Sequence, residues 1–220
     1  MKYKLTDEIM TTESGVLLHR IECIDGFGSV KAGDIGGWIE KEENLSQFGD
    51  AWVYDNARVY GDARVYDNAR VCDNARVYDN ARVYDNARAY GYARVFGDAE
   101  VYGYTWVYGD ARVYGEAEVY GYARVYGYAR VYGYAWVYGD ARVYGDAVIG
   151  NSNDYIVFKN NWSSGRYFTW TRSNDMWKVG CFYGNGKELI EKAYKDSKLS
   201  GDCYKAYVEL VDKLKEQQKQ

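Results

Sequence analysis

The feature that most constrains this chain is a six-residue repeat that begins at Ala51 and continues to Gly150. Each repeat reads A-R-V-Y-G/D-D/N/Y, and alanine fills the first position of every repeat except the one that begins at Thr105. Valine fills the third position of every repeat except at Ala89 and Ile149. A period this strict predicts a solenoid, because a unit this small can bury its apolar face only against its neighbours.

The alternation inside one repeat predicts a short strand of about four residues, with alanine and valine on its inner side. The fifth position ends the strand, because it holds either glycine or an aspartate that is followed by asparagine, as in Asp55-Asn56. These residues adopt positive φ at low cost, so every repeat predicts one sharp corner. The fourth position is an outward-facing tyrosine except at Cys72, Phe96 and Gly150.

Written from the valine, the pattern is V-x-x-x-A-x, which resembles the hexapeptide repeat of left-handed parallel β-helix proteins. In that family three repeats form one triangular coil, so the resemblance implies about five to six coils here. Residue i would then lie over residue i+18, which arranges the outer positions in columns. One second-position column contains only arginine, and the fourth positions form aromatic columns beside the second-position ones.

The segments on either side of the repeats predict a cap and a second domain. Gly15–Ile24 reads as a cap strand, and an open solenoid end requires such a cap. After the repeats, 154–158, 166–172 and 176–184 read as three strands, and apolar residues at helical spacing follow from Leu189 onwards. The expected fold class is mainly β, with a triangular left-handed parallel β-helix, an N-terminal β cap and a small β-β-β-α-α domain. The expected boundaries are 1–44, 45–150 and 151–220.

Composition excludes several classes of protein. The net charge of −4 gives no overall attraction to nucleic acid, and the repeats hold 11 arginines against 13 acids. The four cysteines are far apart and form no CxxC pair, which argues against a zinc ribbon or a disulfide framework and favours a reducing cytosol. The chain has no apolar run of membrane-spanning length, so we expect a cytoplasmic protein without a membrane partner.

The outer positions of the repeats supply the first set of candidate binding residues. Arginine, tryptophan and tyrosine are enriched at interface hot spots, and exposed aromatic columns indicate a partner or self-association. Three tryptophans replace arginine in the second position and are expected on the outside, and three tyrosines take the sixth position near the end of the repeats. The expected binding residues of the repeats are Arg58, Arg76, Arg94, Arg112, Arg130, Trp52, Trp106, Trp136, Tyr122, Tyr128 and Tyr134.

The C-terminal domain supplies a second set, for which a surface role and a core role are equally expected. Its aromatic and basic residues lie within a short span, where they form either a binding surface or the core of a small domain. These residues are Trp162, Arg166, Tyr167, Trp170, Arg172 and Trp177.

Catalytic signatures are scarce. Left-handed β-helix proteins include many acyltransferases, and the resemblance to them implies a histidine general base near a groove between neighbouring subunits. This chain has a single histidine, His19, which lies outside the repeats, and a structural role is the more expected one. No phosphate-binding, zinc-protease or serine-hydrolase motif is present. We therefore expect no catalytic residue, cofactor or metal.

The stretch "VKAGDIGGWIEKEENLSQFGDAWVYDNARVYGDARV" resembles the opening of hexapeptide-repeat proteins from bacteriophages and prophages. The resemblance implies a phage-borne accessory protein in a bacterial cytoplasm. The favoured function is a non-enzymatic binding protein that acts on a host factor, such as a defence protein, by contact or by sequestering a ligand. A host protein and a second copy of the chain are the expected partners, and a nucleotide or nucleic acid stays open. Two alternatives are a hexapeptide-repeat acyltransferase that uses His19 and a structural part of a virion.

Overall fold

The computed structural model describes residues 1–218 and confirms the expected fold class, a mainly-β chain with a parallel β-solenoid of about six turns. Its contacts divide the chain into two compact units, Met1–Ser152 and Asn153–Gln220. The first unit contains the N-terminal cap and the solenoid, and the second contains a small antiparallel sheet and two helices.

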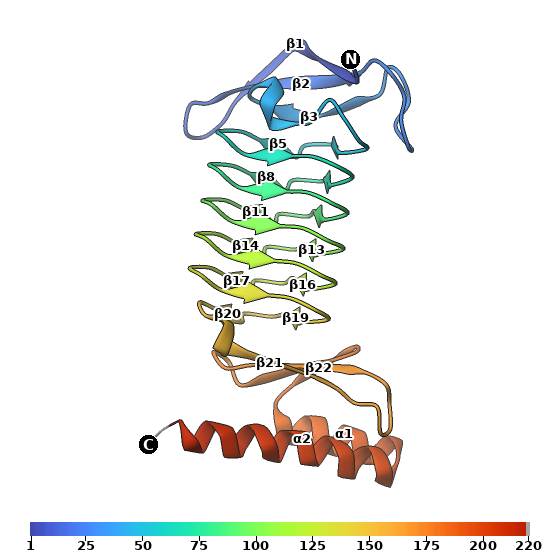
Figure 1. Ribbon diagram of the computed structural model, residues 1–220, viewed down its shortest axis with the longest axis vertical. Helices are drawn as coiled ribbons and strands as arrows, with labels where there is room; N and C mark the ends of the chain where they lie inside the picture. Colours follow the sequence, from blue (N-terminus) through green and yellow to red (C-terminus); the bar gives the residue numbers. More distant parts are fainter. Residues whose placement is uncertain (219–220) are drawn as a thin grey trace. The chain divides into compact units, whose positions relative to one another are not determined.

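Each repeat of the solenoid contributes one strand, formed by its second and third residues (Figure 1). The strands have two residues instead of the expected four, because the turn follows directly after the tyrosine. They are β4 (Trp52–Val53), β5 (Arg58–Val59), β6 (Arg64–Val65), β7 (Arg70–Val71), β8 (Arg76–Val77), β9 (Arg82–Val83), β10 (Arg88–Ala89), β11 (Arg94–Val95), β12 (Glu100–Val101), β13 (Trp106–Val107), β14 (Arg112–Val113), β15 (Glu118–Val119), β16 (Arg124–Val125), β17 (Arg130–Val131), β18 (Trp136–Val137), β19 (Arg142–Val143) and β20 (Val148–Ile149).

Every third strand pairs in parallel, which produces three sheets around the solenoid. One sheet runs β4-β7-β10-β13-β16-β19, a second runs β6-β9-β12-β15-β18, and the third runs β5-β8-β11-β14-β17-β20 and continues into the cap. The register places Arg58 opposite Arg76 and Arg64 opposite Arg82, a separation of 18 residues. The columns expected from the repeat are therefore present.

The interior of the solenoid is a stack of alanine and valine with no exposed surface, as at Ala87 and Val95. The corner positions adopt positive φ, whether the residue is aspartate, as at Asp73, or glycine. At Gly103 the φ is 75°, and an added Cβ would lie 3.0 Å from the backbone nitrogen and oxygen of Gly121 in the next coil. Corners of this kind therefore tolerate only residues that accept left-handed backbone and close stacking.

The cap covers the first coil and is continuous with one sheet. It consists of β1 (Tyr3–Thr11), β2 (Leu17–Cys23), β3 (Ile35–Ile39) and the 3-10 turn η1 (Glu42–Asn44). Strands β1 and β2 pair antiparallel, β2 pairs antiparallel with β3, and β3 pairs in parallel with β5. The cap thus extends this sheet to nine strands, and β1 of the cap forms its edge in place of a solenoid strand.

The cap overturns one expected surface residue. Trp52 was expected outside, but only 1% of it is exposed. Tyr3 and Phe27 of the cap contact its ring edge-to-face, with centroids 6.0 and 5.6 Å away. An added Cβ at Gly36 would lie 2.7 Å from the Trp52 ring, so that glycine makes room for it. A second-position residue in the first coil faces the cap instead of solvent, and Trp52 is a core residue.

The second unit has four strands where three were expected. The 3-10 turn η2 (Ser152–Asp154) precedes β21 (Tyr155–Lys159), β22 (Tyr167–Thr171), β23 (Met176–Val179) and β24 (Phe182–Gly184). The stretch 176–184 bends at Gly180, where φ is 56°, and forms a hairpin instead of one strand. Helices α1 (Gly186–Asp196) and α2 (Lys198–Gln217) follow. Asn185 caps α1, because its side chain accepts a hydrogen bond from the Glu188 amide.

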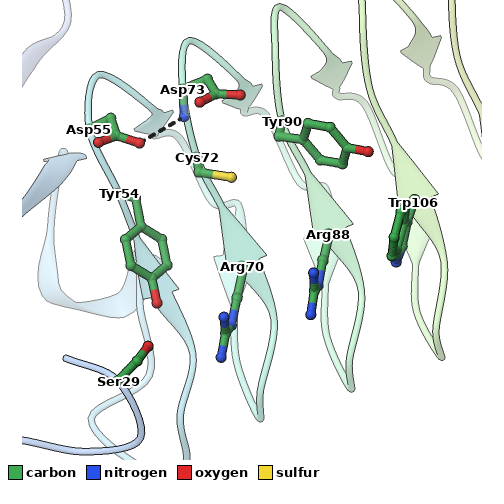
Figure 2. A pocket seen from close by; sticks show the side chains of 9 residues that line it. All are labelled: Ser29, Tyr54, Asp55, Arg70, Cys72, Asp73, Arg88, Tyr90 and Trp106. Carbon is green, nitrogen blue, oxygen red and sulfur yellow. Dashed lines mark hydrogen bonds between the residues drawn. The ribbon is translucent and has the colours of Figure 1, made fainter.

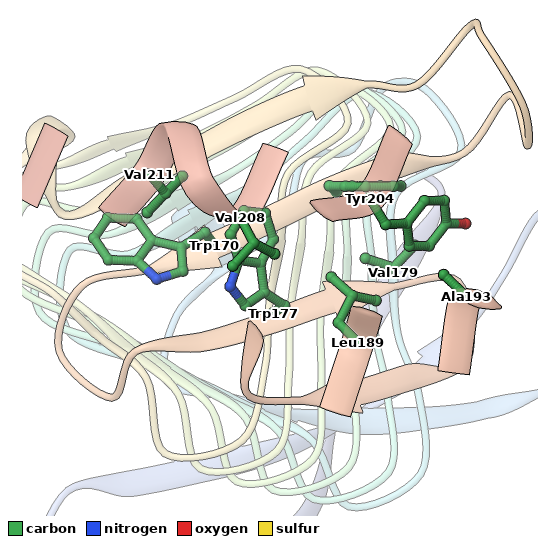
Figure 3. Close-up of a cluster of buried hydrophobic side chains, with 9 residues drawn as sticks. Trp170, Trp177, Val179, Leu189, Ala193, Tyr204, Val208 and Val211 are labelled. Carbon is green, nitrogen blue, oxygen red and sulfur yellow. The ribbon is translucent and has the colours of Figure 1, made fainter. Parts of the chain in front are cut away.

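The core of this unit joins the sheet to both helices (Figure 3). Trp170 and Trp177 are each 2% exposed and contact the apolar faces of the helices. The Trp170 indole donates a hydrogen bond of 2.8 Å to the Asp175 carboxylate. A surface role and a core role are equally expected for these two residues from the sequence, and the structure places both in the core.

Candidate functional site

The fourth positions of the repeats form three columns of aromatic rings on the outside of the solenoid, which we call ladders. Two ladders are continuous, with neighbouring rings stacked at centroid distances of 4.8 to 5.4 Å. The first is Tyr60, Tyr78, Phe96, Tyr114 and Tyr132, and the second is Tyr66, Tyr84, Tyr102, Tyr120 and Tyr138. Stacked pairs of this kind each contribute about 0.5–1.5 kcal/mol beyond the area they bury.

The third ladder is interrupted. It lies beside the six-stranded sheet, which runs from β4 to β19. Tyr90 stacks on Tyr108 at 4.8 Å, and Tyr108 stacks on Tyr126 at 4.7 Å. One coil before Tyr90 the ring is replaced by Cys72, and Tyr54 stands one coil before that. The ladder therefore lacks one ring between the coils of Tyr54 and Tyr90.

A groove with a volume of about 380 Å³ lies at this interruption (Figure 2). The groove brings together residues from four coils and one residue of the cap loop, Ser29. Its lining consists of Ser29, Tyr54, Asp55, Arg70, Cys72, Asp73, Arg88, Tyr90 and Trp106. Figure 2 shows the Cys72 thiol between the rings of Tyr54 and Tyr90, with the two aspartates on the corner side and the two arginines on the strand side.

The two sides of the groove carry opposite charge. Arg70 and Arg88 lie on neighbouring paired strands, and among the described residues neither has an ion pair. Arg88 also lies over the Trp106 ring, 5.5 Å from its centroid. Opposite them, Asp73 accepts a hydrogen bond of 2.9 Å from the Gly91 amide through one carboxylate oxygen, which leaves the other oxygen of that carboxylate as a further acceptor. The groove can therefore bind an elongated ligand that is anionic at one end and donates hydrogen bonds at the other.

The Cys72 thiol is a poor nucleophile in this setting. Burial raises its pKa to about 11, with a further increase from Asp73 and Asp55 that the two arginines only partly offset. The thiolate is the reactive form of cysteine, so a thiol with this pKa is almost wholly protonated at neutral pH. Cys72 thus provides an uncharged, small side chain to the floor of the groove rather than a reacting group.

The arginine column of the nine-stranded sheet is screened by the cap at its upper end. Arg76 pairs with Glu13 of the β1–β2 hairpin at 3.1 Å, and this contact lowers the pKa of the Glu13 carboxyl. The hairpin tip and the first three arginines line a second groove with a volume of about 310 Å³. Arg112 and Arg130, further along the column, are exposed. The five expected arginines are thus in one column, but they differ in their surroundings.

The remaining expected residues of the solenoid do not gather in one patch. Trp106 lines the groove, whereas Trp136 is 50% exposed on the five-stranded sheet. Tyr122, Tyr128 and Tyr134 are 62 to 74% exposed, but successive repeats place them at three different corners. They surround the solenoid and form no common surface.

In the second unit the expected residues divide between core and surface. Trp162 is 78% exposed, and Arg166 and Arg172 are also exposed. Tyr167 is half-buried, and the Lys159 ammonium lies 5.2 Å from its ring centroid. No pair of tryptophans therefore forms a shared exposed surface in the described part of this unit, because Trp170 and Trp177 are buried.

His19 lies on β2 and does not line the groove. Its Nδ1 is 3.2 Å from the carbonyl oxygen of Thr6, which can only accept, so Nδ1 carries the proton in this hydrogen bond. Nε2 of the neutral ring is then the acceptor. The neighbouring Arg20 does reach the edge of the groove, where its Nη1 donates to the Asp55 carbonyl at 2.9 Å.

Residues 1–218 contain no group of three or more His, Cys, Asp or Glu side chains that could hold a metal ion. Within the same residues no helix is both long and apolar enough to span a membrane.

Comparison with known proteins concerns the solenoid. The family model described as "YdcK Beta solenoid repeat" matches residues 51–66, 69–81, 75–91, 123–139 and 135–151. These segments cover less than a third of the chain, and they support a β-helix of the hexapeptide-repeat kind. Both the groove and the coils near the C-terminal end of the solenoid contain matched segments.

A curated relative carries an activity in its name. "Uncharacterized acetyltransferase YdcK" of Escherichia coli (strain K12) is 41% identical to this chain over 61 residues. The alignment covers 24% of this chain and 19% of that protein, so the similar region is about a fifth of the relative's length.

These matches overturn the favoured function. The expectation of a non-enzymatic binding protein directed at a host factor is wrong, because the similar protein is named an acetyltransferase, which supports the acyltransferase alternative. The matches give no support to a phage origin, counter-defence or inhibition.

Sequence reasoning missed the groove, although its main signal was visible. Cys72 stands out as one of the few exceptions in the tyrosine column. What the pattern alone did not show is that the cap loop with Ser29 closes one end of the gap that this exception leaves.

Proposed function

We propose that this chain is an acyltransferase of the hexapeptide-repeat kind, which transfers an acyl group from a thioester donor to an amine or hydroxyl acceptor. The observation that carries the proposal is the 41% identity over 61 residues to a protein named an acetyltransferase. The groove at Cys72 supports it, because it is an apolar cleft with a few convergent polar groups on the same solenoid.

The groove is the donor site in this proposal. Acyl donors of this class carry phosphate groups, and Arg70 and Arg88 present two guanidiniums from neighbouring strands to such an anion. The thioester itself is uncharged and would lie along the aromatic part of the groove. Cys72 takes no part as a covalent carrier, since burial keeps its thiol protonated.

His19 is the general base in this proposal. The hydrogen bond to the Thr6 carbonyl leaves Nε2 as the acceptor, which is the atom that would take the proton of the acceptor group. The acceptor nitrogen or oxygen bonds to the thioester carbonyl carbon, the carbon–sulfur bond breaks, and the proton held by His19 passes to the departing thiolate. A homo-oligomer would bring His19 of one copy to the groove of another, and this assembly is part of the proposal.

The test uses acetyl-coenzyme A as donor probe with glucosamine and spermidine as acceptor probes. Isothermal titration measures donor binding, and a thiol-reactive dye measures release of coenzyme A. We expect His19→Gln to lose at least about 100-fold in turnover while donor binding changes less than about threefold. Arg70→Gln combined with Arg88→Gln should weaken donor binding instead.

Arg112→Gln with Arg130→Gln is the matched control, because it removes two arginines from neighbouring coils of another sheet. A folded wild-type protein that binds no acetyl-coenzyme A at millimolar concentration would overturn the proposal. Turnover that survives in His19→Gln would remove His19 from it and leave the donor site standing.

A further inference from the structure

We propose that the gap in the third ladder is a slot for a single nucleobase, which stacks on Tyr90 over Cys72 while its phosphate binds Arg70 and Arg88. The ligand class is a nucleotide whose base carries an exocyclic amine. This inference goes beyond acyl transfer, because a free nucleotide would make the same contacts as the nucleotide end of an acyl donor.

The spacing of the coils determines the size of the slot. Rings in neighbouring coils of the ladders stack at centroid distances of 4.7 to 5.4 Å, so one coil accommodates one ring. Tyr90 has one face covered by Tyr108, and its other face is turned to the coil of Cys72. The described residues provide no aromatic ring for that second face. A planar heteroaromatic ring would continue the ladder at the missing position.

The arginines add an anion requirement to the stacking site. Arg70 and Arg88 occupy paired positions on adjacent strands, which lie about 4.8 Å apart, so their like charges repel unless an anion lies between them. At two positions of the other sheets an acid meets this problem, because Arg76 pairs with Glu13 at 3.1 Å and Arg82 pairs with Glu100 at 3.0 Å. Arg112 and Arg130 have no ion pair among the described residues, but the ladder beside them is continuous, with Tyr114 stacked on Tyr132. In the groove no described acid takes that place, and a phosphate would.

The corner side of the groove favours a base with an amino group. Asp55 and Asp73 each accept a hydrogen bond from a backbone amide of the next coil through one carboxylate oxygen. The donors are the amides of Asp73, at 3.4 Å, and Gly91, at 2.9 Å. A carboxylate has two oxygens, so each can accept a further N–H donor. Adenine and cytosine present such donors on their edges, whereas uracil presents carbonyl oxygens there.

The floor of the slot is uncharged. Below the raised pKa of about 11 the Cys72 side chain is a neutral thiol, and its polarizable sulfur makes favourable contacts with aromatic rings. The interruption spans a single coil, since Tyr90 and Tyr108 already stack on each other. A mononucleotide therefore fits the slot, whereas a single strand that stacks several bases would find only one position.

The experiment compares ligands and two substitutions of one residue by isothermal titration. The ligands are AMP, adenosine, ribose 5-phosphate, UMP, coenzyme A and a short oligodeoxyadenylate. Cys72→Tyr restores the ring and closes the slot, whereas Cys72→Ala leaves it open. We expect AMP to bind Cys72→Tyr about tenfold to 100-fold more weakly than the wild type, and Cys72→Ala within about threefold.

The ligand series separates stacking from charge. Ribose 5-phosphate and UMP should bind more weakly than AMP, and Arg70→Gln should weaken AMP without changing adenosine. Coenzyme A binding tighter than AMP identifies the acyl donor as the source of the nucleotide, and equal binding identifies a free nucleotide. Oligodeoxyadenylate binding far tighter than AMP would overturn the single-base slot in favour of a strand-binding surface.

Other outcomes also decide against the slot. Equal AMP binding by Cys72→Tyr and the wild type would place the nucleotide elsewhere, and ribose 5-phosphate binding as tightly as AMP would reduce the site to an anion site. Acetyl transfer that persists unchanged in Cys72→Tyr while AMP binding is lost supports the slot as a site for a free nucleotide and contradicts the groove as the donor site. AMP binding without any acetyl transfer supports the slot and rejects the proposed function.

Discussion

The six-stranded face of the solenoid and the five-stranded face share the same interior, the same coil spacing and the same strand length, but they differ on the outside. On the five-stranded face the ladder is continuous, and Tyr84 and Tyr102 donate hydrogen bonds of 2.9 and 3.0 Å to Glu100 and Glu118. Glu100 also pairs with Arg82. In these coils the face therefore pairs its own charges and rings, whereas nearer the cap Arg64 is exposed and has no ion pair among the described residues.

Near the cap, the six-stranded face has neither a continuous ladder nor paired arginines. It lacks one ring at Cys72, and its two neighbouring arginines have no acid within pairing distance among the described residues. The difference between the faces therefore shows how a repeat protein can vary its outer surface while its interior stays the same. The alanine and valine positions fill the interior of every coil, and a departure from the repeat at the outward-facing Cys72 leaves a groove without disturbing that core.

The largest expected effect comes from the interior, where the faces should not differ. Replacing Ala87 beside the six-stranded sheet or Ala99 beside the five-stranded sheet with leucine places three extra carbon atoms in a core with no exposed surface. Overpacking of this kind costs about 1–3 kcal/mol or more. Denaturant unfolding should show the same large loss for both variants. A loss in only one of them would contradict the shared interior.

Alkaline pH should have the next largest effect, because it weakens the continuous and the interrupted ladders alike. Burial raises the pKa of Tyr60 and Tyr78 above the ordinary tyrosine value of 10.0, and raises that of Tyr90 to about 12. Above pH 10 the unfolded chain releases tyrosine protons that the folded chain retains, so the free energy of unfolding falls as pH rises. The contribution is complete below pH 10 and is lost as pH passes through the folded pKa values.

Thermal unfolding followed by circular dichroism between pH 8 and pH 12 measures this loss. Tyr60→Phe combined with Tyr78→Phe keeps both rings and removes two ionisable hydroxyls, as Phe96 already does in the same ladder. That variant should lose less stability at pH 11 than the wild type. A midpoint temperature that is independent of pH up to 12 would contradict the burial of these rings.

The smallest expected effect compares the interrupted ladder with a restored one. Cys72→Tyr adds a stacking partner to Tyr90 and should raise the free energy of unfolding by about 0.5–1.5 kcal/mol. Tyr84→Cys makes the reverse change on the five-stranded face and should lower it by more, because the hydrogen bond to Glu100 is lost as well. Urea titration of the ligand-free proteins measures both. A Cys72→Tyr protein that is less stable than the wild type would show that the gap is not simply a missing ring.

Much of the solenoid could be predicted from the sequence, because the residues of each repeat indicate its strand, its corner and its buried side. Alternation decides which side of a residue is buried, the fifth position decides the corner, and the period places Arg58 over Arg76. The groove was harder to predict. Cys72 is visible as an exception, but its significance depends on Ser29 of the cap loop and on Arg70 and Arg88 having no ion pair among the described residues, which are facts about distant segments.

The predictions for Trp52 and for the strand over 176–184 were wrong because both depend on contacts that the local pattern does not show. Trp52 takes an outer position in its repeat, yet it is buried, because in the first coil the cap with Tyr3 and Phe27 covers the place where solvent meets later coils. The third strand expected in the second unit bends at Gly180, where φ is 56°, and Phe182–Gly184 folds back to pair with Met176–Val179.

The sequence by itself determined the period, the buried alanine and valine positions, the corners and the columns, because in a solenoid these follow from neighbours a fixed number of residues apart. The tertiary structure alone decided which outer residues are exposed, where the cap covers them and how Tyr54, Cys72, Tyr90 and the two arginines of the groove come together. Burial and pairing at these positions depend on contacts between segments whose separation the repeat does not encode.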